Sequence, residues 1–232
     1  MTATATTIEV VIEGRFNGPP DTANGGYACG LLAQTAASWH GKDVAVTILA
    51  PPPLNTPLEF RPGARRSTCC QGDDLIATVM ATSTPSPVPS PVSVAAAAAA
   101  SRHYAGHRGH PFPTCFACGV DRSDGLGLAP GPLDRPGTVA CVWIPADAVP
   151  VPVLWSVLDC PGGWTGDPVA RPVVLSRMSA TLLATPVPGR PHVVVAAAVR
   201  DSGRTSVRAT AVYTDSGRLV AHARAVWTAV DH

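Results

Sequence analysis

Residues 24–38 read NGGYACGLLAQTAAS, and this stretch decides the fold class. It opens on an asparagine and two glycines and continues with apolar or small residues on nearly every side of a helix. A helix that is apolar all round is buried all round, and its small side chains allow strands to pack closely against it. We therefore predict a central helix, ending near Ser38, that is enclosed by a sheet.

Short alternating segments surround this helix in the first half of the chain. Residues 7–13 alternate as a strand before it, and strands are predicted after it at 43–50, 56–62 and 74–82. The order is one strand, one buried helix and then a run of antiparallel strands.

The second half repeats this order. Residues 137–144 read as a strand and 153–160 as a short helix, which the Pro-Gly-Gly sequence at 161–163 is expected to stop. Further strands are predicted at 172–184, 192–200, 204–214 and 218–229. Glycine-containing turns separate the last three, which predicts hairpins between them. Two similar α+β units therefore follow each other along the chain.

A segment of different composition joins the halves. Residues 83–92 alternate proline with small residues, which excludes a helix or a central strand. The alanines that follow favour a short helix on propensity alone. We divide the chain into an N-terminal unit at 1–84, a linker with a short helix at 85–112 and a C-terminal unit at 113–232.

The composition excludes several classes of protein. With 46% hydrophobic residues, 14% charged residues and a formal net charge of +1, the chain is globular and lacks the basic excess of nucleic-acid-binding proteins. The longest apolar stretch, 94–100, is far shorter than the ~20 residues of a membrane span. Residues 1–14 have neither the basic nor the apolar segment of a secretion signal. We expect a cytoplasmic protein with reduced thiols.

Three segments resemble the acyl-CoA thioesterases of the double-hotdog superfamily. They are residues 16–27 at the start of the first central helix, 46–51 in the following strand and 155–159 in the second helix. Their order and spacing carry the resemblance, which covers roughly residues 5–82 and 113–230. It implies an α+β fold of two fused hotdog units, in which an antiparallel sheet wraps around two central helices.

The resemblance also implies a catalytic site. Bacterial double-hotdog thioesterases activate water with an Asp on the second helix, a hydroxyl residue on the next strand and a Gln on the last strand. Asp159 matches the first position, and counting back from Pro186 places Ser176 at the second. The third position falls on Ala225, beside Arg224, so the chain departs from the pattern there.

Asp159 is also unusual on the residues alone, because the helix around it is otherwise apolar. A buried carboxylate is costly unless it is hydrogen-bonded or paired. Two interpretations stay open. Asp159 is either a general base for a water molecule or a cap of the turn toward Gly162.

The start of the first helix is a second candidate. Asn24, Gly25 and Gly26 could present backbone N–H groups to the carbonyl oxygen of a thioester. Alternatively, Asn24 is an ordinary N-cap and the glycines allow close packing. Gln34, two turns along, is a candidate substrate-binding residue in a cavity of the first unit.

Cys115 and Cys118 form a CxxC pair that follows three histidines, the nearest being His110. One such pair with a histidine could complete a tetrahedral zinc site, but no second pair follows at ribbon spacing. A redox pair and a structural turn are the alternatives. Cys160 reads as a small hydrophobe, and we assign neither a metal ligand nor a cofactor.

Arginines gather around the predicted turn at 201–203. Arg200 and Arg204 flank it, and Arg208 follows. They could bind the phosphates of coenzyme A or of a phosphopantetheine arm, and Arg224 joins the candidate substrate-binding residues. Otherwise they form a charged edge that discourages pairing between sheets.

Three hypotheses follow. The first is a hydrolase of acyl-CoA or acyl-carrier thioesters, with water activated by Asp159 and the substrate entering between the units. The second is a non-hydrolytic relative that binds acyl thioesters or catalyses another reaction on them. The third is a scaffold that assembles through its sheet edges. We expect an acyl thioester as the partner and a homo-oligomer, with no nucleic acid and no membrane.

Overall fold

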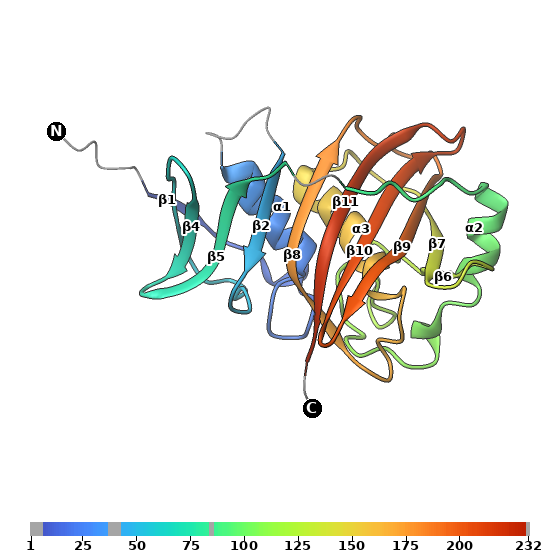
Figure 1. Cartoon of the computed structure of the whole chain (residues 1–232), viewed down its shortest axis with the longest axis horizontal. Coiled ribbons are helices and arrows are strands. Elements are labelled where there is room, and N and C mark those ends of the chain that lie inside the picture. Colours follow the sequence, from blue (N-terminus) through green and yellow to red (C-terminus); the bar gives the residue numbers. More distant parts are fainter. Residues whose placement is uncertain (1–6, 37–42, 84–85, 231–232) are drawn as a thin grey trace.

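The computed structural model describes residues 7–36, 43–83 and 86–230. These residues form one antiparallel sheet of eleven strands, and two central helices pack against one of its faces (Figure 1). From edge to edge the strand order is β1-β3-β4-β5-β2-β8-β11-β10-β9-β7-β6. In this described part of the chain, no helix is long and apolar enough to span a membrane.

The first half contributes five strands and one central helix. Its helix α1 is capped by Asn24, whose Oδ1 accepts a hydrogen bond from Tyr27 N at 2.9 Å. The predicted helix end near Ser38 lies outside the described residues. The elements are β1 (Ile8–Val10), a 3-10 turn (Gly14–Phe16), α1 (Gly25–Thr35), β2 (Val44–Ile48), β3 (Leu58–Arg61), β4 (Ser67–Gln71) and β5 (Asp74–Ala81).

The strand β4 is absent from the sequence prediction. Its residues, STCCQ, are too few and too polar to show a clear alternation. It forms because a tight turn returns the chain onto β5, and Gly72 has the positive φ of 57° that this turn requires.

The second half contributes six strands and the other central helix. The elements are β6 (Gly131–Pro132), β7 (Thr138–Trp143), α3 (Val151–Gly163), β8 (Val173–Leu182), β9 (His192–Ser202), β10 (Thr205–Thr214) and β11 (Leu219–Ala229). The order β7-β9-β10-β11-β8 around α3 repeats the order β1-β3-β4-β5-β2 around α1. The predicted repeat of one unit is therefore confirmed.

The two units share one sheet because β2 pairs with β8, with Val46 opposite Met178. In Figure 1 this junction lies at the middle of the sheet, and both central helices lie behind it. The prediction of one body with a shared sheet is confirmed.

The helix α1 contacts α3 through two of its glycines. A Cβ at Gly26 would lie 2.5 Å from Asp159 Cβ, and one at Gly30 would lie 2.7 Å from Pro152 Cα. The two helices therefore run antiparallel, with the start of α1 beside the end of α3. Gly26 and Gly30 therefore serve this contact between helices, whereas Gly25 packs against Leu175 as the sequence interpretation expects of a neighbouring strand.

The helix α3 continues past the predicted stop. Pro161 lies inside it, and the helix ends at Gly163. A proline removes one backbone donor from the helix, but the last turn is held by tertiary packing. A Cβ at Gly162 would lie 3.0 Å from Trp227 Nε1, and one at Gly163 would lie 3.1 Å from Trp227 Cη2. The expected stop at Pro161 is wrong.

The linker lies on the outer side of the sheet. Residues 83 and 86–92 form neither helix nor strand, whereas 84 and 85 lie outside the described residues. Then α2 (Val94–Ser101) packs Ala97 in a cluster with Val193 and Tyr213, on the face opposite α3. Figure 1 shows α2 at one end of the sheet. The exact unit boundaries, 1–84, 85–112 and 113–232, stay a prediction.

Candidate functional site

A cavity of about 510 Å³ lies where the start of α1 meets the end of α3. This volume is within the range of small-molecule sites in proteins. Both units and the segment between them line it. The apolar lining includes Ile48, Leu49, Phe112, Trp164, Val173 and Leu175, and the polar lining includes Asn24, Asp159, Ser176 and Thr228.

Asp159 connects the two central helices at this cavity. Its side chain is 2% exposed, and its Oδ2 accepts a hydrogen bond from Gly26 N at 2.8 Å. Its Oδ1 is buried and has no hydrogen-bond partner among the described residues. Burial raises the pKa of this carboxyl to about 8, although the Gly26 N–H opposes part of that shift. The carboxylate thus reaches across to α1, whereas the capping interpretation requires a bond to its own turn.

The three residues at the start of α1 have separate positions. Gly26 gives its N–H to Asp159. Gly25 lines the cavity, and its N–H belongs to the first turn, where a helix provides no acceptor. Asn24 directs its Nδ2 toward two sulfurs, Cys115 Sγ at 3.7 Å and Cys160 Sγ at 3.4 Å.

Ser176 lies at an irregularity of the sheet. Leu175 pairs with Trp227, and Arg177 pairs with the adjacent Val226. Ser176 is therefore the extra residue of a β-bulge. Ser176 Oγ donates to Val226 O at 3.0 Å and accepts from Thr228 Oγ1 at 3.2 Å. Ser176 and Thr228 both line the cavity. Thr228 was not predicted, because it becomes a partner of Ser176 only through the bulge that joins their two strands.

Ala225 occupies the position expected for a glutamine, and it is buried away from the cavity. Ala225 is 2% exposed and pairs with Met178 and Arg208 inside the sheet. Trp227 lies two residues further along, and it lines the cavity. Its Nε1 is buried without a hydrogen-bond partner in the described part of the chain. The sequence places Trp227 on the same strand face as Ala225, which is the signal that could have identified it.

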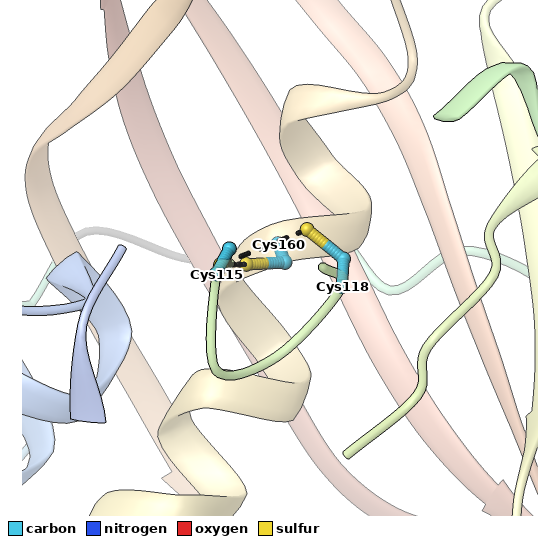
Figure 2. A group of neighbouring side chains, drawn as sticks. All are labelled: Cys115, Cys118 and Cys160. Atoms are coloured by element: carbon cyan, nitrogen blue, oxygen red, sulfur yellow. Dashed lines mark hydrogen bonds between the residues drawn. The ribbon is translucent and has the colours of Figure 1, made fainter. Parts of the chain in front are cut away.

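Three cysteines meet at the cavity wall (Figure 2). Cys115 Sγ lies 3.8 Å from Cys118 Sγ and 3.8 Å from Cys160 Sγ. Hydrogen bonds from the other two thiols lower the pKa of Cys115 well below its ordinary value. His110 Nε2 lies 3.4 Å from Cys118 Sγ. The sequence singles out the CxxC pair, but only the fold brings Cys160 to it.

A smaller cavity of about 200 Å³ adjoins the first and contains arginines. Arg204 lines it together with Arg171 and Arg208, and the two cavities share lining residues such as Gly163. Arg208 also forms an ion pair of 2.6 Å with Asp201.

The other predicted substrate-binding residues lie outside these two cavities. Gln34 is exposed near the end of α1, and Arg200 is exposed on β9. Arg224 is half-buried on β11, where it pairs with Ser179. Their substrate-binding roles stay predictions.

Solved structures of similar fold cover the whole of this chain. A tesB protein of Mycobacterium avium subspecies paratuberculosis superposes with a TM-score of 0.63 at 12% identity, over 100% of this chain and 95% of that one. The acyl-CoA thioesterase II TesB2 of Mycobacterium marinum gives 0.62 at 11% identity, over 100% and 95%. The chain has a double-hotdog fold.

Another neighbour in structure is a protein of Novosphingobium aromaticivorans described as a thioesterase. It has a TM-score of 0.65 at 13% identity, over 100% of this chain and 98% of that one. The sequence matches no family model and no curated protein. At these identities the likeness establishes the double-hotdog fold, and it confirms the resemblance expected from the sequence in that respect.

Proposed function

We propose that this double-hotdog protein hydrolyses acyl-CoA or acyl-carrier thioesters, with water activated by Asp159. The observation that carries the proposal is the unpaired Oδ1 of Asp159 at a largely apolar cavity between the units. Two of the neighbours in fold are named for acyl-CoA thioesterase or thioesterase activity, which supports the same reaction here.

In this mechanism Asp159 is a general base with one fixed oxygen. Gly26 N–H holds Oδ2. In the ionised carboxylate, which prevails above the pKa of about 8, Oδ1 accepts a proton from water as the water oxygen attacks the thioester carbonyl carbon. The tetrahedral intermediate carries its negative charge on the former carbonyl oxygen, where the Gly25 N–H stabilises it. The C–S bond then breaks, and the leaving sulfur takes the proton from Asp159 to give a free thiol and a carboxylic acid.

The water itself needs further partners. Trp227 also lines the cavity, and its Nε1 is buried beside Gly162 without a partner among the described residues. A shift of the indole would bring this N–H to the water, in place of the amide that a glutamine would provide at position 225. The linked hydroxyls of Ser176 and Thr228 supply additional hydrogen-bonding groups there. We infer that these three side chains orient the water toward the carbonyl carbon.

The two cavities suit the two ends of an acyl thioester. The acyl chain would lie along Ile48, Leu49 and Leu175, which line the larger cavity. The phosphates of the carrier arm would lie by Arg171, Arg204 and Arg208 in the smaller one.

A non-hydrolytic acyl-thioester protein is the second candidate. Ala225 favours it, because the buried alanine removes the glutamine that orients water in the thioesterases this chain resembles. Such a protein would still bind acyl thioesters in the same cavity.

A panel of acyl-CoAs of increasing chain length tests both candidates. Free thiol release is followed with a chromogenic disulfide, and binding is measured by calorimetry with ketone analogues that cannot be hydrolysed. Thiol release that depends on chain length supports hydrolysis. Binding without thiol release supports the second candidate. If neither binding nor release is observed, both candidates are contradicted and the scaffold hypothesis remains.

A cytoplasmic location and a homo-oligomeric state belong to the same proposal. Light scattering coupled to size-exclusion chromatography measures the oligomeric state, and a monomeric mass would contradict the proposed homo-oligomer.

A further inference from the structure

Cys115, Cys118 and Cys160 come from two segments that are far apart in the sequence. The first two lie on the loop that precedes β6, and the third lies near the end of α3 (Figure 2). All three are buried, and their sulfurs lie within 4.8 Å of one another. We propose that these cysteines and His110 bind one Zn²⁺ ion, independently of thioester hydrolysis.

The spacing of the sulfurs matches the coordination of zinc. Zinc binds cysteine sulfur at about 2.3 Å in a tetrahedron, so two such ligands lie about 3.8 Å apart. Cys115 Sγ lies 3.8 Å from Cys118 Sγ and 3.8 Å from Cys160 Sγ. Little movement is therefore required to place one ion between them.

A disulfide explains the arrangement less well. A disulfide bond is about 2.05 Å long and joins only two sulfurs, whereas three sulfurs converge here. The other buried cysteines provide a contrast, because Cys29 and Cys141 lie outside the cluster of possible metal ligands. Burial as small hydrophobes accounts for these two, but it does not account for three sulfurs at one point.

A hydrogen-bond donor faces two of the sulfurs, as expected for thiolate ligands. Asn24 Nδ2 points at Cys115 Sγ and Cys160 Sγ, and its orientation is fixed because Oδ1 accepts from Tyr27 N. Partners of this kind orient metal ligands and stabilise their charge.

His110 would provide the fourth ligand, although its ring must move because Nε2 does not lie within 4.8 Å of all three sulfurs. Its Nε2 lies 3.4 Å from Cys118 Sγ, and a tetrahedral Cys–Zn–His site requires about 3.5 Å between sulfur and nitrogen. Its Nδ1 accepts a hydrogen bond from Phe112 N at 2.9 Å. Coordination through Nε2 moves the ring proton to Nδ1, so this short contact must open as the metal binds.

Four protein ligands leave no open position, so the zinc is structural. It would fasten the loop that contains Cys115 to α3 and, through Asn24, to the start of α1. These segments form one wall of the large cavity. The ion would therefore stabilise that wall without taking part in the reaction.

Metal analysis of the purified full-length chain tests the site directly. We expect one equivalent of zinc per chain after expression with zinc, and a lower melting temperature after chelation. Replacement by Co²⁺ should give a thiolate-to-metal charge-transfer band and the intense visible bands of a tetrahedral site. Cys115→Ser and Cys160→Ser should lose the metal, whereas Cys70→Ala, a buried cysteine on β4 outside the cluster, should retain it.

Two further variants examine the remaining partners. His110→Ala should weaken zinc binding and shift the visible cobalt bands, and an unchanged spectrum would exclude His110 as a ligand. Asn24→Ala should weaken zinc binding by about 10- to 100-fold, the usual effect of removing an outer partner.

The wild-type protein keeps the proposal testable even if the cysteine variants fail to fold. A wild-type chain that contains no zinc and gives no cobalt charge-transfer band overturns it. A Cys115–Cys118 disulfide found by mass spectrometry in protein purified under reducing conditions without chelator also overturns it.

Discussion

The two central helices occupy equivalent places in a repeated unit, yet they bring different groups to the cavity. At its start α1 supplies backbone, namely the N–H groups of Gly25 and Gly26. Near its end α3 supplies side chains, namely Asp159 and Cys160. Because the helices are antiparallel, these two ends meet. A fused repeat can therefore divide one site between its copies.

The difference between the helices has a steric cause. Asp159 comes within reach of the Gly26 N–H only because Gly26 has no side chain, since a Cβ there would lie 2.5 Å from Asp159 Cβ. The position on α1 that faces Asp159 therefore cannot carry a chemical group of its own.

Replacement of the Asp159 carboxyl group on α3 should have the largest effect on activity. Asp159→Asn should lower kcat for acyl-CoA hydrolysis by about 10²- to 10⁴-fold, the usual contribution of a positioned acid–base group. The fold should survive, because the amide oxygen can still accept the Gly26 N–H. Asp74→Asn, at the exposed start of β5, is the matched control. An Asp159→Asn variant with full activity would show that Asp159 of α3 is not the general base.

Addition of one methyl group to α1 should affect stability next. Gly26→Ala should lower the free energy of unfolding by about 1–3 kcal/mol, because the Cβ also comes within 2.7 Å of Trp155 O. Urea titration measures this effect. Gly166→Ala is the control, since its Cβ would meet only Arg208 Nη2 at 3.8 Å. Equal stabilities would show that the contact between the helices is not tight.

Loss of one hydroxyl at the bulge should have a smaller effect. Ser176→Ala should reduce kcat about 2- to 10-fold, because a single neutral hydrogen bond contributes about 0.5–1.5 kcal/mol. Ser179→Ala, three residues along β8 and outside the large cavity, should leave kcat unchanged. A loss as large as that of Asp159→Asn would assign Ser176 a part in bond breaking.

The smallest effect concerns pH and a histidine of the second unit. Both ring nitrogens of His192 are engaged, Nδ1 with Arg190 O at 2.9 Å and Nε2 with Val187 N at 3.4 Å. Burial lowers the pKa of His192 below its unfolded value. The neutral ring therefore stabilises the fold above about pH 6.5, and this contribution is lost as pH falls through the folded pKa. His192→Gln should weaken the pH dependence of the melting temperature between pH 7 and 5, and an unchanged dependence would contradict this role.

The sequence predicts the parts of the molecule that regular patterns control. Alternation and glycine-containing turns predict most strands, and the small-residue stretch at 24–38 predicts α1. Resemblance to a family identifies Asp159 and Ser176, and both line the large cavity.

The remaining features depend on contacts between distant residues. The helix α3 continues through Pro161 because its last turn packs against Trp227. The bulge at Ser176 changes the pairing of β8 with β11, so the sequence does not show that Ser176 and Thr228 meet. Cys160 reads as a small hydrophobe until the fold brings it 3.8 Å from Cys115. In each case the local sequence carries too little information about the partner.

The most direct test of the shared site is a crystal structure with an acyl-CoA ketone analogue, in which a methylene group replaces the thioester sulfur. We predict that its carbonyl oxygen accepts a hydrogen bond from Gly25 N. We also predict a water molecule that donates a hydrogen bond to Asp159 Oδ1 and whose oxygen faces the carbonyl carbon. The acyl chain should follow the apolar lining between the units. A carbonyl group bound outside the junction of α1 and α3 would contradict the account.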